Sequence, residues 1–539
     1  MLNDEDIESL EKPITLDEIK IALSLASNNK SPGIDGLPYE FYSSFLDMLG
    51  EDLLGVYNNI FKTGTMSMSQ RTGIVTLLPK KGDKTDPTNW RPISLLNTDY
   101  KLISKVLQIR MSKVLPTIVN EHQTCSVPGR SIHDNMFIIR DIIDYSAMKK
   151  IDCALISIDQ HKAFDKVSWS FLMRVLEKLR FGSNFRKWVT ILYNNIYSRI
   201  LINGNLSDIY PLLEGIRGFP IPGGSGRRVK FLQYADDATC VATNIGDIAQ
   251  YFNVFKLFQK ATGASVNMSK TCGLKLGTFA SRQLPTNIHW STSSIKITGV
   301  TFGSKEAVHC NWATKVKSAT LLAKSWSSRH LTLLGKVLVT NTVIYPLFYF
   351  VAPVFRVPDS VVKEVNKAVF SFIWGENKPD LVSRKVIILD RLQGGLGLDS
   401  FRNKMDALLI RPLFTLLTRM QDPPIHFIIA RFFLAMPLRR VFPQLWSNTR
   451  PNSAVCPPSL LYASDIIRRL HSMDSLFFQS SKSIKLITKS LQPSGANLIA
   501  VRDYPAFPWE TIWKLAFSNM LGNKLMDFQW RLASHFVHR

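Results

Sequence analysis

Two periodic patterns of apolar residues run along this chain. Five segments carry apolar residues at the spacing of an amphipathic helix, namely residues 14–26, 39–63, 169–179, 185–197 and 245–262. Pro32, Gly33 and Gly36 separate the first two segments, and Gly263 follows the last one in the position of a helix C-cap. The pattern therefore predicts helices in these five places.

The second pattern is typical of short strands. Residues 154–158 form a largely apolar run of strand length, and Asp159 falls where that run ends. Apolar residues also lie on both sides of Tyr234-Ala235-Asp236-Asp237, which predicts a hairpin with two acids at its tip. Asn203-Gly204 predicts a further hairpin after residues 200–202. Antiparallel strands covered on one side by helices give an α+β fold.

The second half of the chain has a helical pattern. Residues 312–355 are mostly helical, basic and aromatic, and the helical character continues from Asp359 to the end. Three lysines of the basic stretch either face solvent or follow the backbone of a nucleic-acid duplex: Lys315, Lys317 and Lys324. Aromatic residues further on are expected in the core: Phe427, Phe432 and Phe433.

The composition narrows the class of partner. With 539 residues, 45% of them apolar, the chain is long enough for roughly three to four domains with hydrophobic cores. Its formal net charge of +24 and its pI near 9.7 indicate a polyanionic partner. Nucleic acid is the leading candidate, and an anionic membrane surface is the competing one.

A membrane span is not expected. The most apolar stretch, residues 343–355, is interrupted by Pro346 and Pro353 and is shorter than the roughly 20 residues that cross a bilayer. Met1 is followed by a run rich in acidic residues, unlike a secretory or transit leader, so we expect a nuclear or cytoplasmic location. The six cysteines are scattered without a close pair, which predicts neither a zinc site nor a disulfide framework.

The acidic residues suggest a metal site. If the strand that ends at Asp159 lies beside the hairpin tipped by Asp236 and Asp237, three carboxylates gather at one edge of a sheet. Carboxylates without neighbouring histidine or cysteine ligands suit hard cations such as Mg²⁺, and two such ions support phosphoryl transfer. An Asp-Asp pair alone is more often only a turn-forming element, so the hypothesis depends on the third acid.

A series of motif blocks occurs in order along the chain. They are Asn29-Lys30-Ser31-Pro32-Gly33-Ile34-Asp35-Gly36, Leu78-Pro79-Lys80-Lys81-Gly82, Asn89-Trp90-Arg91-Pro92-Ile93-Ser94-Leu95, Pro128-Gly129-Arg130-Ser131-Ile132-His133-Asp134-Asn135, the Asp159 block through Val167, the Tyr234 block, Gly263-Ala264-Ser265-Val266-Asn267-Met268-Ser269-Lys270 and Ile297-Thr298-Gly299-Val300-Thr301-Phe302-Gly303. In this order they resemble the reverse transcriptases of LINE-type (non-long-terminal-repeat) retrotransposons. Phe372-Ile373-Trp374-Gly375 and Gly394-Gly395-Leu396-Gly397-Leu398 are similar to the region after the polymerase in these elements.

The resemblance implies an RNA-directed DNA polymerase with a right-hand architecture of fingers, palm with an antiparallel sheet, and helical thumb. The expected divisions are residues 1–70 for an N-terminal helical extension and fingers, 71–303 for fingers and palm, 304–360 for a thumb-like helical region, and 361–539 for a truncated, mostly helical C-terminal region of LINE type. The implied partners are an RNA template, a DNA primer and deoxynucleoside triphosphates. The oligomeric state stays open.

By the same resemblance, Asp159, Asp236 and Asp237 would hold two Mg²⁺ ions. Phe164 would lie under the incoming sugar and exclude a 2′-hydroxyl by its bulk. Without the resemblance, Phe164 would be read as an ordinary core aromatic.

Basic residues are implied at the triphosphate. Lys80, Lys81 and Arg91 resemble the finger residues that clamp it, since ammonium and guanidinium groups pair with phosphate charge. The alternative interpretation is that these three residues belong to a solvated basic loop. Lys270 would donate a proton to the leaving pyrophosphate, or would be only a charge after a helix.

One block of the family pattern is missing. Between the Asp159 and Tyr234 blocks, the family carries a Gly-rich turn of the type Gln-Gly-Cys-Pro-Leu-Ser-Pro and a helix that supports template and nucleotide. Here residues 213–217 run directly into residues 218–223, which indicates an internal deletion at Arg217-Gly218. Removal of a buried helix exposes apolar surface and takes away a catalytic wall. We therefore expect the chain to keep the family chemistry in its motifs but to be inactive.

Two other functions stay open. One is a non-catalytic relic that binds nucleic acid, and the other is a maturase-like RNA-binding protein related to intron-encoded reverse transcriptases. The blocks at residues 372–375 and 394–398 favour LINE ancestry over the maturase. Neither the family's endonuclease domain nor its Cys/His-rich knuckle is recognised in the sequence, which predicts a fragment of a longer polyprotein.

Overall fold

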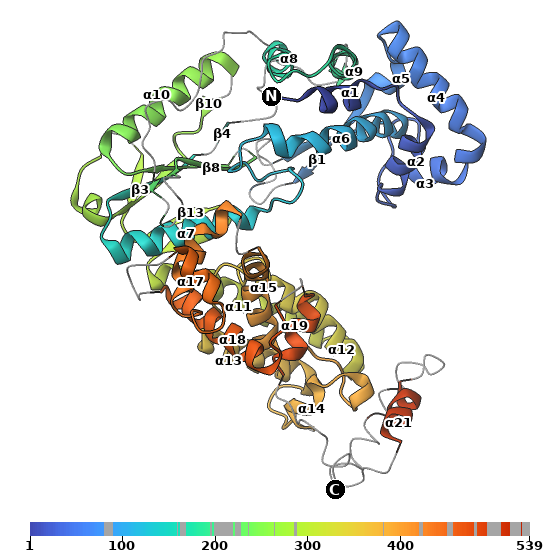
Figure 1. Ribbon diagram of the computed structural model, residues 1–539. Coiled ribbons are helices and arrows are strands. Elements are labelled where there is room, and N and C mark those ends of the chain that lie inside the picture. The colour runs from blue at the N-terminus through green and yellow to red at the C-terminus, as the bar shows by residue number, and fades with distance from the viewer. Residues whose placement is uncertain are drawn as a thin grey trace. The chain divides into compact units, whose positions relative to one another are not determined.

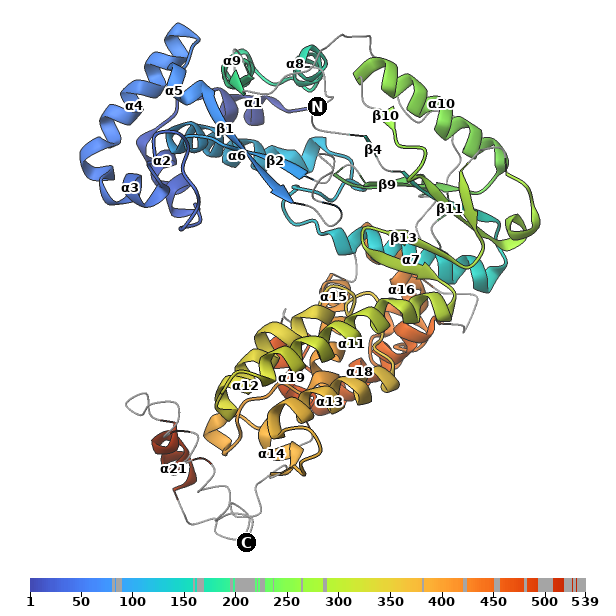
Figure 2. The same ribbon diagram turned by 180° about the vertical axis from the view of Figure 1, so that it is seen from behind.

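The computed structural model describes most of the chain. It covers residues 1–79, 83, 90–158, 160–161, 169–193, 197–198, 219–220, 222, 228–235, 237–262, 265–284, 288–380, 382–419, 424–449, 456–478, 482–492, 508–517, 526 and 530. The chain divides into two compact units, each assembled from separated stretches (Figure 1, Figure 2). Unit 1 comprises Met1–Arg130, Asp159–Gly215 and Gln250–Met268, and unit 2 comprises Ser131–Ile158, Ile216–Ala249 and Ser269–Arg539.

Unit 1 is mainly helical. Its helices are α1 (Asp4–Glu11), α2 (Leu16–Ser24), α3 (Tyr39–Ser44), α4 (Leu46–Thr63), α5 (Met68–Arg71), α6 (Thr98–Ile118), α8 (Trp169–Lys178) and α9 (Ser183–Tyr193). Thr15 and Glu18 form a reciprocal capping box at the start of α2, and the left-handed Gly64 ends α4. The apolar faces of these helices meet in one core, in which Tyr57 and Trp188 are buried.

Short strands complete unit 1. β1 (Thr72–Pro79) pairs antiparallel with β2 (Trp90–Leu95) and parallel with β5 (Tyr197–Ser198). The two-residue strands β4 (Gln160–His161) and β10 (Ser265–Val266) pair with each other. Helix α10 (Ile245–Thr262) contains the point where the chain passes from unit 2 to unit 1.

A five-stranded sheet is the main β-structure of unit 2. Its strand order is β12 (His289–Ser291), β11 (Cys272–Leu276), β3 (Cys153–Ile158), β9 (Asp237–Ala242) and β8 (Phe231–Tyr234). The central strand β3 is antiparallel to both neighbours and almost entirely buried, as expected of a strand covered on both faces. Smaller pairs join β13 (Ser294–Ile297) to β14 (Val300–Gly303) and β6 (Phe219–Pro220) to β7 (Arg228–Val229).

Helix α7 (Ile132–Lys149) packs along this sheet (Figure 1). A capping box between Ser131 and Asp134 closes its N-terminus, and the left-handed Lys150 follows its last residue. Its buried side chains, such as Met136 and Ile139, belong to the same core as those of β3, β8 and β9. The helix is therefore the support on which one face of the sheet lies.

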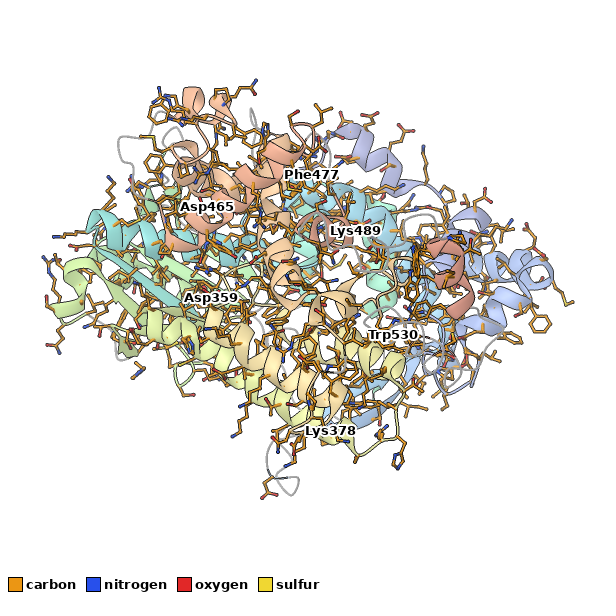
Figure 3. The ribbon with its side chains drawn as sticks, turned by 90° about the horizontal axis from the view of Figure 1, so that it is seen from below. Asp359, Lys378, Asp465, Phe477, Lys489 and Trp530 are labelled. Carbon is orange, nitrogen blue, oxygen red and sulfur yellow. The ribbon has the colours of Figure 1, made fainter. Side chains whose placement is uncertain are left out.

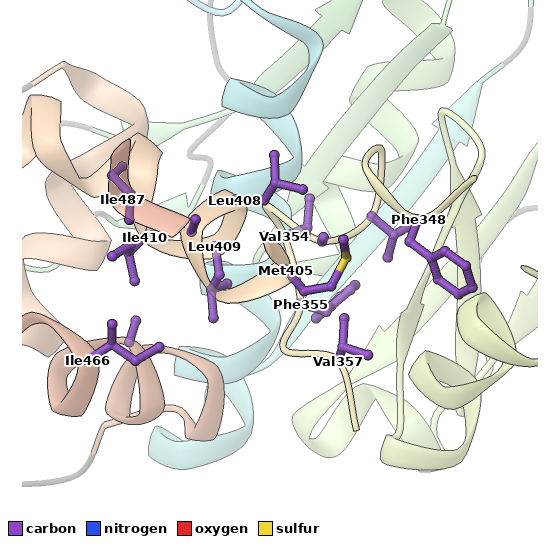
Figure 4. Close-up of a cluster of buried hydrophobic side chains, with 14 of the residues drawn as sticks. Phe348, Val354, Phe355, Val357, Met405, Leu408, Leu409, Ile410, Ile466 and Ile487 are labelled. Atoms are coloured by element: carbon purple, nitrogen blue, oxygen red, sulfur yellow. The ribbon is translucent and has the colours of Figure 1, made fainter. Parts of the chain in front are cut away.

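The remainder of unit 2 is helical. Its helices are α11 (Lys305–Ser327), α12 (Leu333–Val339), α13 (Asp359–Trp374), α14 (Arg384–Ile388), α15 (Phe401–Thr418), α16 (Ile428–Ala435), α17 (Pro443–Thr449), α18 (Pro458–Met473), α19 (Ile484–Ser490) and α21 (Trp509–Ala516), with shorter turns η2 (Gly277–Ser281), η3 (Thr340–Ile344), η4 (Tyr345–Phe348), η5 (Arg391–Gln393) and η6 (Ile425–Phe427). Figure 4 shows the apolar cluster in which α15, α18, α19 and the segment before α13 meet. No helix in the described part of the chain is long and apolar enough to cross a membrane.

The segment between η4 and α13 is bonded to two helices. Arg140 of α7 donates a hydrogen bond to the carbonyl of Val354 (2.9 Å), and Arg402 of α15 donates one to the carbonyl of Val357 (2.8 Å). Because both donors are held by their own helices, α7 under the sheet and α15 in the helical part are tied to the same stretch of backbone. The sheet and the helices of unit 2 therefore belong to one packed body.

The Gly-rich block at residues 394–398 is a packing feature. A Cβ at Gly395 would lie 1.9 Å from the carbonyl oxygen of Leu389, so no larger residue fits there. The buried indole of Trp530 donates to the carbonyl of Gly394 (3.0 Å), and Figure 3 labels this side chain together with the surface residue Lys489. The block therefore anchors a distant part of the chain.

The predicted strands and helices are confirmed with shifted bounds. β3, the β8–β9 hairpin and α10 lie where the apolar pattern predicts them. The helix predicted over residues 39–63 is interrupted at Phe45, which leaves the helical conformation, and the one over residues 185–197 ends at Tyr193. The hairpin at Asn203-Gly204 and the cap at Gly263 lie outside the described residues.

The basic stretch over residues 312–355 is helical only in part. Its first helix starts earlier, at Lys305, because Ser304 provides the N-cap. Beyond Val339 the regular helix gives way to η3 and η4, and Pro346 in η4 has no N–H for a regular helical hydrogen bond. The expected core aromatics are confirmed, since Phe427 and Phe433 are buried and Phe432 packs on the same core.

Candidate active site

Three strand ends meet at one end of the five-stranded sheet. Ile158, the last residue of β3, lies opposite Ala238 near the start of β9. The β8–β9 hairpin closes at the same end, with Tyr234 opposite Asp237. β11 pairs with β3 from its own first residue. The end of β3, the tip of the hairpin and the start of β11 therefore lie side by side.

The hairpin turn consists of Ala235 and Asp236, of which the structure describes Ala235. Its φ of +53° lies in the left-handed region that two-residue hairpin turns require. A residue with a Cβ adopts this conformation at a cost of about 1 kcal/mol. Asp237 follows as the first residue of β9, with a partly exposed side chain. The tip is thus a tight and mildly strained turn that ends in a carboxylate.

The expected metal-binding acids are described in part. Asp237 lies at the tip as predicted, whereas Asp159 and Asp236 lie outside the described residues. Among the described histidines, cysteines, aspartates and glutamates, no group of three could hold a metal ion. That finding does not extend to a set containing Asp159 and Asp236.

The expected nucleotide-binding residues are distributed in the same way. Three of them lie outside the described residues: Lys80, Lys81 and Phe164. Arg91 belongs to β2, where its backbone lies opposite Leu78. Lys270 is exposed in the turn just before β11, at the same end of the sheet as the hairpin tip. The structure therefore brings Lys270 and Asp237 to one end of the sheet.

Two cysteines lie near this sheet end. Cys240 lies in β9 and Cys272 begins β11, and burial raises the pKa of both thiols. Such burial disfavours the thiolate that a metal-binding cysteine must supply. A carboxylate such as that of Asp237, by contrast, suits a hard cation such as Mg²⁺.

In unit 1, the block at residues 29–36 is docked on the start of α6. A Cβ at Gly33 would lie 2.1 Å from Oδ1 of Asn97, so this glycine is required by close packing. Lys101 donates from Nζ to the carbonyl of Ser31 (3.0 Å). Partial burial lowers the pKa of Lys101. The sequence contains both segments but gives no signal that they touch.

A groove of about 340 Å³ runs between α11 and α13 in unit 2. Ala323 and Phe372 are among its buried lining residues, and its exposed lining carries lysines and glutamates: Lys324, Lys367, Glu364 and Glu376. The lining is therefore of mixed charge.

The lysines expected to follow a duplex differ in environment. Lys317 is exposed, and Lys324 is exposed on the wall of the groove. Lys315 is half-buried, and burial lowers its pKa. Their positions on α11 are compatible with either of the two readings of this helix.

Sequence reasoning misses two amide side chains at the hairpin. Gln233 donates from Nε2 to the carbonyl of Ala235 (2.8 Å), and Asn135 of α7 donates from Nδ2 to the carbonyl of Gln233 (2.8 Å). Asn135 lies in one of the motif blocks, which is the signal that could have found it. Gln233 carries no signal beyond its place two residues before the turn.

Comparisons with known proteins agree with this geometry. A family model described as reverse transcriptase (RNA-dependent DNA polymerase) matches residues 78–302, which include β3, α7 and the β8–β9 hairpin. The transposon TX1 uncharacterized 149 kDa protein of Xenopus laevis is 31% identical over 430 residues, covering 74% of this chain and 33% of that protein.

More distant relatives are similar over shorter stretches. The retrovirus-related Pol polyprotein from type-1 retrotransposable element R2 of Popillia japonica is 25% identical over 292 residues, which cover 49% of this chain and 40% of the polyprotein. The probable RNA-directed DNA polymerase from transposon BS of Drosophila melanogaster is 26% identical over 171 residues, covering 31% of this chain and 19% of that protein. The matches thus span 40% or less of the length of these three relatives. Residues 78–302 thus match the reverse transcriptase family, and the chain is similar to proteins of non-long-terminal-repeat retrotransposons, which supports a LINE-type reverse transcriptase.

Proposed function

We propose that this chain is the polymerase region of a LINE-type element, with the residues for RNA-directed DNA synthesis by two-metal phosphoryl transfer. The observation that carries the proposal is the strand register, in which Ile158 lies opposite Ala238 and Tyr234 opposite Asp237. Asp159 follows Ile158 directly in the sequence. In this proposal Asp159, Asp236 and Asp237 share one end of the sheet.

Two Mg²⁺ ions are the cofactors assigned to these acids. The donor chemistry fits, since Asp237 offers a partly exposed carboxylate, and Mg²⁺ takes oxygen ligands of this kind. When bound, such ions polarise phosphoryl oxygens and help ionise the attacking hydroxyl. The carboxylates of the chain bind the ions and fix their positions at the tip of the hairpin.

The partners in this proposal are an RNA template, a DNA primer and deoxynucleoside triphosphates. Lys80, Lys81 and Arg91 clamp the triphosphate, and Phe164 excludes the 2′-hydroxyl. Lys270 donates a proton to the leaving pyrophosphate, which its exposed position just before β11 supports. The net charge of +24 supports binding to nucleic-acid phosphates.

The right-hand description is part of the same proposal. The helices of unit 1 with the β1–β2 hairpin correspond to fingers, the five-stranded sheet with α7 to the palm, and α11 and α12 to the thumb. The divisions fall near residues 70, 303 and 360, with the C-terminal helical region beyond. The mainly antiparallel sheet and its covering helix support the palm assignment.

A second proposal concerns competence. The sequence passes at Arg217-Gly218 directly from the approach to the Gly-rich block into residues that follow it in the family. The helix that supports template and nucleotide is then missing, so the chain binds nucleic acid without extending a primer. Binding should weaken steeply with salt, because each phosphate contact releases a counterion.

One experiment tests both proposals. The chain and a version with the Gly-rich block restored are given a primed RNA template, Mg²⁺ and deoxynucleotides, and extension and RNA binding are measured at several salt concentrations. We expect salt-sensitive binding by both and extension by the restored version alone. Asp237→Asn in the restored version should abolish extension and leave binding within about twofold, whereas Asp47→Asn on the exposed face of α4 is the matched control.

The outcomes separate the proposals. Extension by the chain as it stands would refute the loss of competence. Extension that survives Asp237→Asn at a near-normal rate would refute the metal site. An RNA affinity that does not change with salt concentration would argue against a phosphate-binding surface.

A further inference from the structure

The turn at the hairpin tip is held by a side chain of its own strand. Ala235 adopts the left-handed conformation (φ +53°), which a residue with a Cβ adopts at a cost. Gln233 lies two residues earlier in β8, and its Nε2 donates to the carbonyl of Ala235 (2.8 Å). This hydrogen bond bridges from the strand to the first residue of the turn, so it favours the closed turn over more open ones.

The strand that carries Gln233 is itself held from outside the sheet. β8 is an edge strand of the five-stranded sheet, in which β9 is its one neighbouring strand. Asn135 of α7 is 5% exposed, and its Nδ2 donates to the carbonyl of Gln233 (2.8 Å). The backbone of Gln233 is thus held by α7, while its side chain holds the carbonyl of Ala235.

The helix turn that carries Asn135 is anchored on further sides. Nε2 of His133 lies 3.0 Å from the carbonyl oxygen of Phe350, and Oδ1 of Asp134 lies 3.4 Å from Nε2 of His426. Three consecutive residues of α7 therefore contact three different segments of unit 2. Burial lowers the pKa of His133 and brings that of His426 to about 4, so both rings are neutral near pH 7. These contacts need no protonation to persist.

We propose that Gln233 and Asn135 are positioning residues that fix the hairpin turn and thereby aim the carboxylate of Asp237. This role rests on the metal site of the proposed function, which it deepens. A metal site works only when its ligands are held within about 0.5 Å of the productive geometry. A strained turn without a tether samples other conformations, and a carboxylate carried on it then binds a metal more weakly.

Hydrogen–deuterium exchange and metal binding test the role without requiring polymerase activity. Gln233→Met keeps the length of the side chain and removes the donor, and Asn135→Leu does the same for the second amide. Gln259→Met, at an exposed position of α10, is the matched control. Exchange is measured over residues 231–241, and Mn²⁺ binding is titrated by electron paramagnetic resonance, with Asp237→Asn as the reference for loss of the site.

We expect both variants to raise exchange in this stretch about three- to tenfold, the factor that one lost hydrogen bond implies. Mn²⁺ affinity should fall about tenfold, as for other residues that orient metal ligands. The Gln259→Met control should match the unsubstituted chain in both measurements, and thermal unfolding of the variants should stay cooperative.

Unchanged exchange in Gln233→Met would show that the amide does not hold the turn and would overturn the proposal. Raised exchange with unchanged Mn²⁺ affinity would overturn the aiming role, because the turn would then move without consequence for the carboxylate. If the unsubstituted chain and Asp237→Asn bind Mn²⁺ equally poorly, the metal site of the proposed function fails, and the aiming role falls with it.

Discussion

Replacing Arg110 with methionine should destabilise unit 1 far more than the same change at another arginine with an equally short ion pair. The Arg110 side chain is 6% exposed, and its Nε and Nη2 each lie 2.7 Å from a carboxylate oxygen of Glu18. Its remaining hydrogen bonds go to three backbone carbonyls, that of Leu10 in the last turn of α1 and those of Lys12 and Pro13 between α1 and α2. One guanidinium on α6 therefore holds the whole connection between α1 and α2.

The magnitude follows from what methionine leaves behind. It fills part of the space but donates no hydrogen bond, so the carboxylate of Glu18 and three carbonyls lose their partner. Breaking a buried ion pair from one side costs about 3–5 kcal/mol. Since the Glu18 side chain is 29% exposed and can recruit water, we expect about 3 kcal/mol, the lower end of that range.

A matched control is available in the same unit. Arg180 pairs with Asp4 at the same 2.7 Å, but the two side chains are 51% and 90% exposed. Exposed ion pairs contribute about 0–1 kcal/mol, so Arg180→Met should cost at most that much. The substitution and the ion-pair distance are the same at both positions, so the comparison contrasts a buried guanidinium with five hydrogen bonds and an exposed one with two.

Hydrogen–deuterium exchange in α2 and α6 is the appropriate assay, because unfolding of a chain with two units does not yield a single free energy. A double-mutant cycle with Glu18→Gln should give a coupling energy of at least about 1 kcal/mol. Equal protection in Arg110→Met and Arg180→Met would refute the reasoning.

The ion pair also predicts a pH dependence. Partial burial raises the pKa of the Glu18 carboxyl, but the hydrogen bonds and charge of Arg110 outweigh this and hold the pKa below its ordinary value. A carboxyl with a depressed pKa stabilises the fold above its unfolded value of about 4.3 and loses that effect as pH falls through the folded value. The difference between Arg110→Met and the unsubstituted chain should therefore shrink below about pH 4.

Three further predictions concern unit 2 and α4. Burial raises the pKa of Asp144 to about 7, so its charge opposes folding increasingly from about pH 4 to 7. Asp144→Asn should therefore raise the urea midpoint of unfolding more at pH 8 than at pH 5. An equal gain at both pH values would contradict this prediction. Gly395→Ala should destabilise unit 2 by at least about 2 kcal/mol, because its Cβ would meet the carbonyl of Leu389, and unchanged exchange in α14 would contradict the clash. Gly55→Ala has open space within α4 and should stabilise this helix by about 0.5–1 kcal/mol, visible as slower exchange there.

The elements of this fold that could be predicted are those with a local signal. The run from residue 154 to 158 and the apolar residues flanking the Tyr234 block predict β3 and the hairpin. A buried strand can be predicted because its apolar residues lie close together in the sequence. The end of a helix is less visible. Phe45 interrupts the predicted helix although neither glycine nor proline stands there, so tertiary packing and not local propensity sets this break.

Contacts between residues far apart in the sequence escape sequence reasoning for a different reason. Arg110 lies 92 residues from Glu18, and Asn135 lies 98 residues from Gln233 at the hairpin of the candidate site. Arginine, glutamate and amide side chains are ordinary surface residues in a sequence, and only the fold reveals which of them are buried together. The three aspartates could be proposed from the sequence alone, because sequence motifs mark them and no knowledge of contacts is needed.

The interleaving of the two units constrains how the chain is made. Unit 1 begins at Met1, but its last stretch, Gln250–Met268, is synthesised much later. The central strand β3 of unit 2 cannot pair with β11 until the chain has been synthesised past Cys272. A ribosome adds roughly 5–20 residues per second, so the helices before Arg130 exist for several seconds before either unit can close. A nascent chain halted between these points would contain neither unit in complete form.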